Sequence, residues 1–276
     1  MTDSQQHYLL IINGKSAGNP ALREAVNEQR QAGMQITVRA TWEGGDAADI
    51  AELSDAMGIT HVIACGGDGT VSEVMNGLMR LPHDRRPALG IVPLGSANDF
   101  ATSVGLPLEP GPALAAARAL SAYPIDVVRV TAGAGFGAEI TSSTPKTLKR
   151  LLGGGAYSLM GALKAWRHRS YRGTLHWDEK EESASLLLLA LGNGRQSGGG
   201  QVLGPRAKLD DGRLDVLLVK DFRSVTELSK LISELQNFPS EGRFVRYFTT
   251  TQLTLTTQAG DPPWPLTLDG EARCYD

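Results

Sequence analysis

The sequence has few cysteines, no long apolar run and little net charge, and each shortage excludes a class of protein. Cys65 and Cys274 are its only two cysteines, so neither a disulfide framework nor a cysteine-based zinc cluster is available. The longest apolar stretch, 186–191, is far shorter than the roughly 20 residues that a membrane-spanning helix needs. The start of the chain lacks the basic and apolar regions of a secretory signal. These shortages favour a cytoplasmic protein in a reducing compartment.

Charge is nearly balanced, with 27 Lys and Arg against 30 Asp and Glu, which gives a net charge of −3 at pH 7. Counterion release therefore does not attract the whole molecule to nucleic acid, and we expect no nucleic-acid partner. Apolar residues make up 41% of the chain, enough for sizeable cores. A length of 276 residues fits two ordinary domains.

The first part of the chain alternates strand and helix patterns. Apolar runs predict strands at 8–12, 36–40, 62–65, 89–92 and 125–130, and helical patterns lie at 19–33, 46–58, 71–78 and 112–121. Such alternation implies right-handed crossovers and a parallel sheet covered on both faces. We therefore predict that residues 1–126 form a doubly wound α/β domain that binds its ligand beyond the carboxyl ends of the strands.

The later part of the chain has a different pattern. A helical signal runs from about 145 to 168, and strand-forming segments joined by Gly, Asn, Asp and Pro turns follow at 175–177, 185–191, 214–219 and 252–257. This is typical of a β-rich, mostly antiparallel and sandwich-like domain, which we place at residues 127–276.

The loop GGDGT, Gly66–Thr70, lies where a predicted strand meets a predicted helix. Glycines there let the backbone approach a phosphate, and the N–H groups of the helix's first turn point towards it. A structural interpretation is a tight turn in which Thr70 and Glu73 form a capping box, and the two interpretations are compatible. The carboxylate of Asp68 suits a phosphate site if a cation or a network of donors stands between them.

The loop PLGSANDF, Pro93–Phe100, repeats this arrangement after the next strand. Two such loops on adjacent strands would face one crevice, although Ser96 or Asp99 alone equally fits an ordinary helix cap. Two rival motifs fail. Gly14-Lys15-Ser16 lacks the earlier glycine of a P-loop, and the G-x-G-x-x-A at 133–138 has no acid about 20 residues later to hold a ribose.

Three further segments carry polar groups, each with a plain structural interpretation. Asp210-Asp211-Gly212 is a turn or a site for a hard cation. Leu268–Glu271 (LDGE) is a hairpin turn or the position of a general base. One basic and aromatic cluster is a solvated helix face or a patch that meets anionic lipid head groups; its cations are Lys164, Arg167, His168, Arg169 and Arg172.

GGDGT, PLGSANDF, GNGRQSGGG, PRAKLDDGRLDV and LDGE follow one another in this order. On these motifs the chain resembles the diacylglycerol and lipid kinase family over nearly its whole length, and most closely the YegS-like bacterial branch. The ordered set is far more specific than any single motif. The resemblance implies a nucleotide-binding α/β domain, a β-rich second domain, ATP bound in the cleft between them, and transfer of the γ-phosphoryl group to a lipid hydroxyl. In this branch the implied acceptor is phosphatidylglycerol.

The resemblance also implies site residues. The metal, magnesium or calcium, would be held by the Asp211 carboxylate and by Lys208 and Arg213 through backbone carbonyls. Glu271 matches the proposed proton acceptor, with Asp269 as its neighbour. Residues that would hold the nucleotide phosphates are Thr41, Gly67, Asp68, Gly69, Thr70, Val71, Ser72, Glu73 and Ser96, the last of which stands where the family usually has threonine.

Two departures and two alternatives accompany the resemblance. Members usually have a further strand between the segments that match Val130 and Gly135, and they continue past LDGE, so we expect a second domain shortened at its C-terminus. The alternatives are a kinase of a soluble hydroxyl such as that of NAD, and a nucleotide-binding module without turnover. The expected partners are ATP, a phospholipid and, peripherally, the inner membrane surface; the resemblance implies no obligate protein partner.

Overall fold

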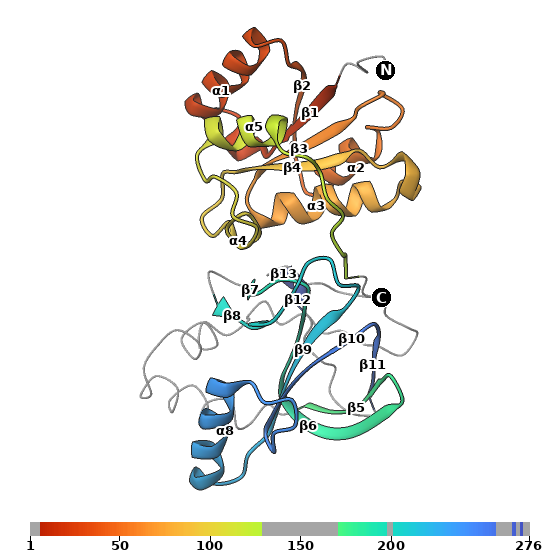
Figure 1. The fold of residues 1–276 in the computed structure, drawn as a ribbon, viewed down its shortest axis with the longest axis vertical. Coiled ribbons are helices and arrows are strands. Elements are labelled where there is room, and N and C mark those ends of the chain that lie inside the picture. The colour runs from red at the N-terminus through yellow and green to blue at the C-terminus, as the bar shows by residue number, and fades with distance from the viewer. Residues whose placement is uncertain (1–5, 129–170, 198–200, 258–266, 269–270, 273–276) are drawn as a thin grey trace. The chain divides into compact units, whose positions relative to one another are not determined.

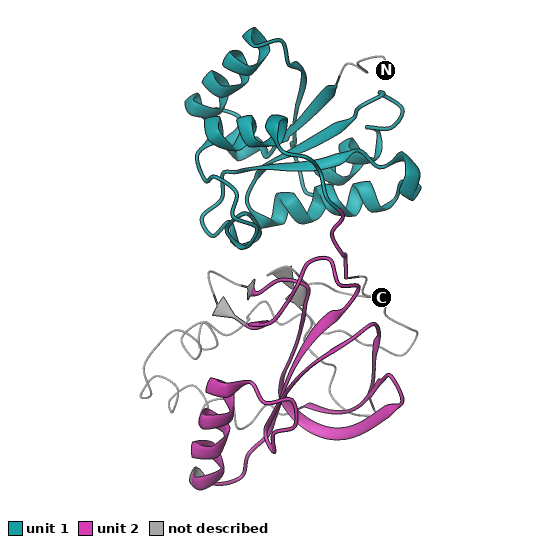
Figure 2. Cartoon of the chain, in the orientation of Figure 1, with its two compact units in different colours: residues 1–123 teal, residues 124–276 magenta. Residues whose placement is uncertain are grey.

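The computed structural model describes residues 6–128, 171–197, 201–257, 267–268 and 271–272. The chain divides into two compact units, residues 1–123 and 124–276 (Figure 2).

The first unit is built on a four-stranded parallel sheet with strand order β2-β1-β3-β4 (Figure 1). The strands are β1 (His7–Ile12), β2 (Gln35–Ala40), β3 (His61–Gly66) and β4 (Ala88–Pro93). The helices are α1 (Pro20–Gln31), α2 (Asp46–Glu52), α3 (Asp68–Met79), α4 (Asp99–Ser103) and α5 (Pro110–Ala119), with short 3-10 helices η1 (Gly14–Ser16) and η2 (His83–Arg85).

Both faces of this sheet are covered, which confirms the doubly wound α/β prediction. Alternate residues of β1 enter different cores: Tyr8 and Leu10 pack with α1 and α5, whereas Leu9 and Ile11 pack with α2, α3 and α4. A strand buried on both faces is apolar throughout, because neither side of its pleat meets water. The loops that follow the four strands therefore share one edge of the sheet.

Helix α1 begins and ends where the sequence predicts. The Asn19 side chain accepts a hydrogen bond from the Leu22 N–H (3.0 Å), Pro20 is the first helical residue, and Gly33 has a φ of 89°. The prediction for α2 was too long, because this helix ends at Glu52 and turns follow it as far as Gly58.

The predicted strand at 125–130 is wrong where the structure describes it. Residues 125–128 of the predicted strand 125–130 have no regular structure, and the rest of it lies outside the described residues. The reason is not local, because Asp126 hydrogen-bonds to loop residues that are distant in the sequence and not to a neighbouring strand. Its N–H donates to the Leu209 carbonyl (2.6 Å), and its own carbonyl accepts from Asn193 Nδ2 (2.8 Å).

The second unit contains a five-stranded antiparallel sheet with strand order β10-β9-β6-β5-β11 (Figure 1). Its strands are β5 (Tyr171–Trp177), β6 (Lys180–Gly192), β9 (Leu214–Lys220), β10 (Val245–Thr250) and β11 (Leu253–Thr256). Two short hairpins pair β7 (Gln196–Ser197) with β8 (Gln201–Val202) and β12 (Thr267–Leu268) with β13 (Glu271–Ala272). The β-rich, mostly antiparallel prediction is confirmed. The helical pattern at 145–168 lies outside the described residues.

Strand β10 and helix α8 (Val225–Asn237) are not among the predicted elements, and α8 packs on one face of this sheet. The signal for α8 was present: the Ser224 hydroxyl accepts from the Glu227 N–H (3.2 Å), the S-x-x-E start of a capped helix. Leu228 and Leu231 then face the core. Within the described residues, no helix is long and apolar enough to cross a membrane.

Candidate active site

Four loops meet at the carboxyl edge of the parallel sheet in the first unit. Backbone hydrogen bonds join the strand ends: Asn13 N–H to the Cys65 carbonyl (3.0 Å), Leu94 N–H to the Gly66 carbonyl (2.9 Å) and Thr41 N–H to the Ile12 carbonyl (2.9 Å). The loops that carry the two predicted phosphate motifs are therefore neighbours, as expected for adjacent strands.

Helix α3 begins within GGDGT. Its N-cap is Gly67, and Asp68 is the first helical residue. The first N–H groups of a helix have no acceptor inside the helix, and they carry partial positive charge. A helix of 12 residues that starts at a glycine loop thus offers the donors that a phosphate requires.

The predicted capping box is wrong. Because α3 starts two residues before Thr70, this threonine is not at the N-cap, and Glu73 does not reach back to it. The Thr70 hydroxyl instead accepts a hydrogen bond from Asn13 Nδ2 (3.2 Å), and Glu73 Oε2 accepts one from the Gly45 N–H (3.2 Å). Both side chains tie the loops after β1 and β2 to α3.

The Asp68 carboxylate joins the two phosphate-type loops. Its two oxygens accept hydrogen bonds from the Asp99 N–H (3.2 Å) and the Phe100 N–H (3.1 Å) at the start of α4. The N-cap residue of α4, Asn98, makes no such bond and has a φ of 51°. The Asp68 carboxylate therefore holds the start of α4 against the start of α3.

Asn98 shapes the second loop from within. Its Oδ1 accepts from the Gly95 N–H (2.9 Å), and its Nδ2 donates to the Gly95 carbonyl (2.9 Å). Ser96 lies on the exposed turn that these two bonds close. Neither Ser96 nor Asp99 is the cap of α4, so the plain structural interpretation of this loop is wrong.

The other residues that the sequence predicts to bind the nucleotide all lie in this unit. The Thr41 hydroxyl accepts from the Gly14 N–H (3.1 Å), so it lies at the same edge as α3. The Val71 side chain is 5% exposed and belongs to the core beneath the helix. Only the main chain of Val71 can therefore face a ligand. Gly67, Gly69 and Ser72 lie in the cap and first turns of α3.

In the second unit, the predicted metal residues lie on one exposed turn, 208–213. Asp211 Oδ1 accepts from the Arg213 N–H (3.1 Å), and Gly212 has a φ of 66°. The Gly212 N–H donates to Asp126 Oδ2 (2.5 Å). The predicted turn is confirmed, and Asp126 is a residue that the sequence analysis missed because nothing local marks it as a partner of this turn.

A buried polar pair that no sequence pattern predicts lies just beyond this turn. Asp215 is 3% exposed, and its carboxylate accepts a hydrogen bond from the Tyr247 hydroxyl on β10. Burial raises the pKa of Asp215. Burial, together with the bond to Asp215, raises the pKa of Tyr247 to about 12. The two residues are far apart in sequence, so only the β9·β10 pairing reveals the contact.

Glu271 lies in β13, opposite Leu268 in β12, which confirms the predicted LDGE hairpin. Asp269 lies outside the described residues, as do Lys164, Arg167, His168 and Arg169 of the basic cluster. Among the described residues, no group of three or more His, Cys, Asp or Glu side chains is placed to hold a metal ion.

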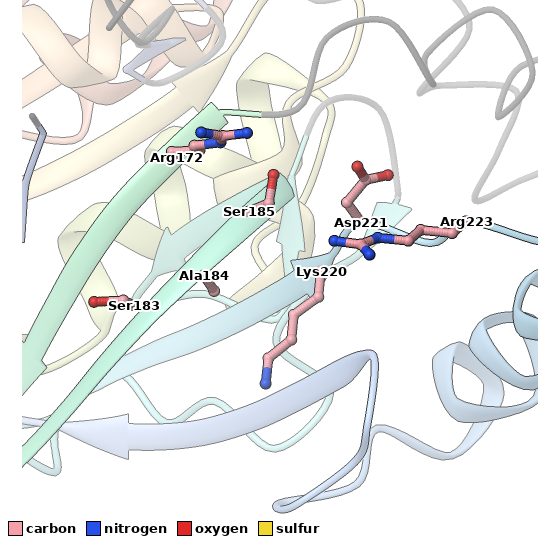
Figure 3. Close-up of a pocket in the computed structure, with 7 residues that line it drawn as sticks. All are labelled: Arg172, Ser183, Ala184, Ser185, Lys220, Asp221 and Arg223. Carbon is pink, nitrogen blue, oxygen red and sulfur yellow. The ribbon is translucent and has the colours of Figure 1, made fainter.

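Arg172 of the basic cluster lines a pocket of about 490 Å³ in the second unit (Figure 3). Within the part of the chain that the structure describes, none of the residues predicted to bind nucleotide or metal lines this pocket. It has three cationic side chains and one carboxylate; the lining residues are Arg172, Ser183, Ala184, Ser185, Lys220, Asp221 and Arg223.

Comparisons with known proteins agree with this geometry. Residues 7–130 match the model of the diacylglycerol kinase catalytic domain, and residues 130–275 match the YegS C-terminal NAD kinase beta sandwich-like domain. A relative from Chromohalobacter salexigens, named "Probable lipid kinase YegS-like", is 52% identical over 95% of this chain and 86% of its own length. One of the same name from Shewanella frigidimarina is 38% identical over 96% of this chain and 87% of its own.

A crystal structure of a diacylglycerol kinase from Bacillus anthracis has the same fold. It superimposes with a TM-score of 0.64 at 23% sequence identity, over 93% of this chain and 88% of that one. The two matching domain models and the identity to curated relatives together show that the chain belongs to the diacylglycerol kinase family, among its YegS-like lipid kinases.

Proposed function

We propose that this chain transfers the γ-phosphoryl group of ATP to the hydroxyl of a membrane lipid, and that phosphatidylglycerol is the acceptor. Its family consists of kinases that act on an alcohol group. The observation that carries the proposal is the junction of the GGDGT and PLGSANDF loops through Asp68. Phosphoryl transfer requires mainly that charge be neutralised and reactants be positioned, and preorganised N–H donors at a helix start do both.

In the first unit, the N–H groups at the start of α3 bind the nucleotide phosphates in this proposal. The hydroxyls of Thr41 and Ser96 add hydrogen bonds from the loops after β2 and β4. The Gly14 N–H already orients the Thr41 hydroxyl (3.1 Å), whereas Ser96 is exposed and can turn towards a ligand. Thr70 and Glu73 act indirectly, because their side chains hold the neighbouring loops.

The Asp211 turn fits a hard divalent cation. Such cations take oxygen ligands, and an exposed carboxylate beside backbone carbonyls in a closed turn supplies them. Asp211 would bind magnesium, or calcium, through its carboxylate, and Lys208 and Arg213 would bind it through their carbonyl oxygens. The cationic side chains of the last two do not interfere in this arrangement. When bound, the metal would supply positive charge that offsets the phosphate oxygens.

Glu271 is the proposed general base. As the lipid oxygen forms its bond to the γ-phosphorus and the bond to ADP breaks, the hydroxyl proton passes to the Glu271 carboxylate. Asp269, two residues earlier in the same LDGE segment, is its proposed neighbour in this role.

The test is transfer of labelled γ-phosphate to vesicles that contain phosphatidylglycerol, diacylglycerol or neither. We expect labelled phosphatidylglycerol, and we expect Glu271→Ala to lower kcat by about 10²- to 10⁴-fold while MgATP still binds. Glu241→Ala, which removes an exposed carboxylate of the same unit, is the matched control. Full turnover in the Glu271 variant would remove the assignment of the base. ATP binding without product on any acceptor would favour the non-catalytic module.

A second candidate acceptor is a soluble hydroxyl such as that of NAD, since the second half of the chain matches an NAD kinase-like domain. Asp68 would then take the proton. Its carboxylate already accepts two backbone hydrogen bonds, which favours the lipid reaction with Glu271 as base. Adding NAD to the same assay separates the two, because labelled NAD phosphate would replace the lipid product.

Peripheral contact with the membrane is part of the proposal. The pocket lined by Arg172, Lys220 and Arg223 suits anionic head groups, although Lys220 also forms an ion pair with Glu182. We expect Arg172→Glu to reduce sedimentation with phosphatidylglycerol vesicles, and Lys230→Glu on the exposed face of α8 to leave it unchanged. Equal losses in both variants would mean that overall charge, and not the pocket, attracts the protein.

A further inference from the structure

Trp42 is 96% exposed, more than any other large apolar side chain in the described part of the chain. An indole in water leaves a large apolar surface without contacts. Exposed aromatic side chains are typical of binding surfaces, because with only two side-chain torsions they supply contact area at little cost in conformational entropy.

The loop that carries Trp42, between β2 and α2, is held in place at several points. The Asp46 carboxylate accepts hydrogen bonds from the N–H groups of Trp42 (2.6 Å) and Glu43 (3.0 Å). At the far end of the loop, the Gly45 N–H donates to Glu73 on α3 (3.2 Å). The backbone that presents the indole is therefore fixed, although the indole itself contacts solvent.

This loop also borders the proposed phosphate site of the same unit. Thr41, the residue before Trp42, is bonded through its hydroxyl to Gly14 at the end of β1 (3.1 Å). Glu73 lies five residues along α3 from Asp68, a rise of roughly 7.5 Å. An exposed π surface thus stands close to the helix start where the phosphates would bind, on an element fixed to that helix.

We infer that Trp42 binds the base of the nucleotide by stacking its indole on the purine ring. The inference rests on the proposed function, since it assigns a place to the base of the nucleotide whose phosphates bind at α3. Every base has a π face, so stacking of this kind adds affinity without strong choice between bases. Trp42 would accordingly strengthen binding of ATP and GTP alike.

The experiment compares two ligands, MgATP and magnesium tripolyphosphate, which has the phosphates but no base. Binding is measured by calorimetry for the full chain and for Trp42→Ala, Trp42→Phe and Leu108→Ala. Leu108 is 52% exposed in the same unit and serves as the control for loss of an exposed apolar side chain.

We expect Trp42→Ala to raise the Kd for MgATP by roughly 5- to 150-fold, which is the range for loss of one base–aromatic stack. Trp42→Phe should keep most of the MgATP affinity of the unaltered chain. Neither variant should change tripolyphosphate binding, and Leu108→Ala should change neither ligand. MgATP should quench the tryptophan fluorescence of the unaltered chain but quench Trp42→Phe less, whereas tripolyphosphate should quench neither.

Two results would overturn the inference alone: unchanged MgATP affinity in Trp42→Ala, or an equal loss of MgATP and tripolyphosphate, which would point to damaged phosphate loops. If the unaltered chain bound neither ligand, the proposed nucleotide site would itself be refuted, and the inference with it. The two failures are therefore distinguishable.

Discussion

Gly67 and Gly95 are in direct backbone contact. A Cβ atom built at Gly95 would lie 2.5 Å from the Gly67 Cα, and one built at Gly67 would lie 3.1 Å from the Gly95 Cα. Neither glycine has a positive φ. Glycine is required here because two loops approach closely, and not because the backbone conformation excludes other residues. The GGDGT and PLGSANDF loops can meet only while both positions lack a side chain.

Gly95→Ala should therefore push the two loops apart. The new methyl group would meet backbone atoms, which cannot rotate away, so we expect a loss of about 1–3 kcal/mol in the free energy of unfolding. MgATP affinity should fall as well, because Ser96 and the start of α3 would no longer share one site. Urea unfolding and calorimetry with MgATP measure the two effects.

Gly111→Ala is the matched control, since a Cβ there meets nothing within 4 Å and the residue lies in α5. This change should be neutral or stabilise the protein slightly. A Gly95→Ala variant with unchanged stability and MgATP affinity would show that the loops can separate without cost, and the close approach would then have no role in the site.

Asp68 should contribute to stability as well as to nucleotide binding. Asp68→Ala removes the acceptor for the N–H groups of Asp99 and Phe100, and loss of such a cap costs about 0.5–2 kcal/mol. Asp68→Asn keeps one acceptor oxygen and should lose less. We expect MgATP affinity to fall in the same order, as measured by urea unfolding and calorimetry on the same samples.

A different order would change the role of Asp68. If Asp68→Asn lost MgATP binding as completely as Asp68→Ala while its stability stayed normal, the charge of the carboxylate would matter more than its hydrogen bonds. Unchanged MgATP affinity in both variants would exclude Asp68 from nucleotide binding.

The parallel sheet of the first unit could be predicted because its signals are local. Every residue of β1 after His7 is apolar and buried, and Asn19, Pro20 and Gly33 mark the ends of α1. The strand proposed over 125–130 failed for a non-local reason. Asp126 finds its hydrogen-bond partners at residues 193, 209 and 212, and no pattern within a strand-length window reports contacts at that distance.

The candidate site likewise has features that local sequence predicts and features that depend on distant contacts. The motifs located the two glycine loops, since a strand followed by glycine and a helix start is visible in sequence. They did not predict that Glu73 bonds to Gly45 or that Thr70 bonds to Asn13. These bonds depend on where α3 begins, and its N-cap lies three residues earlier than predicted, at Gly67 instead of Thr70. Ends of elements are set by such tertiary contacts as much as by local preference.

Asp126 should tune metal binding without touching the metal. It holds the Gly212 N–H (2.5 Å) and thereby closes the turn that carries Asp211. We expect Asp126→Ala to raise the magnesium concentration for half-maximal kinase activity by about 10- to 100-fold, as for loss of an outer partner of a metal ligand. Asp126→Asn keeps an acceptor oxygen, so its magnesium requirement should lie between those of the unaltered chain and Asp126→Ala.

Asp210→Ala controls for charge, because it removes a neighbouring carboxylate from the same exposed turn. It should change the magnesium requirement little. An equal rise in the magnesium requirement of Asp126→Ala and Asp210→Ala would mean that the turn attracts metal through its net charge. The hydrogen bond from Gly212 to Asp126 would then not contribute to metal binding.

The Tyr247 hydroxyl bond to Asp215 should make stability depend on alkaline pH. Burial and Asp215 raise the pKa of Tyr247 from 10.0 to about 12. Between these values the folded chain keeps a proton that the unfolded chain has lost, so the folded state binds more protons and stability falls as pH rises from 10 towards 12. The contribution is fully present below pH 10. Tyr247→Phe should remove this part of the decline, and Tyr123→Phe, at an exposed tyrosine, should not.

At neutral pH the same Tyr247→Phe change should cost about 1–3 kcal/mol, because it leaves a buried oxygen of Asp215 without its donor. Adding Asp215→Asn should restore part of the loss, since an amide is less costly than an unpaired carboxylate to bury. Urea unfolding followed by the fluorescence of Trp177, 4% exposed in the same unit, measures both effects. If Tyr247→Phe unfolded at the urea concentration of the unaltered chain at pH 7 and at pH 11, the hydrogen bond would contribute nothing to the second unit.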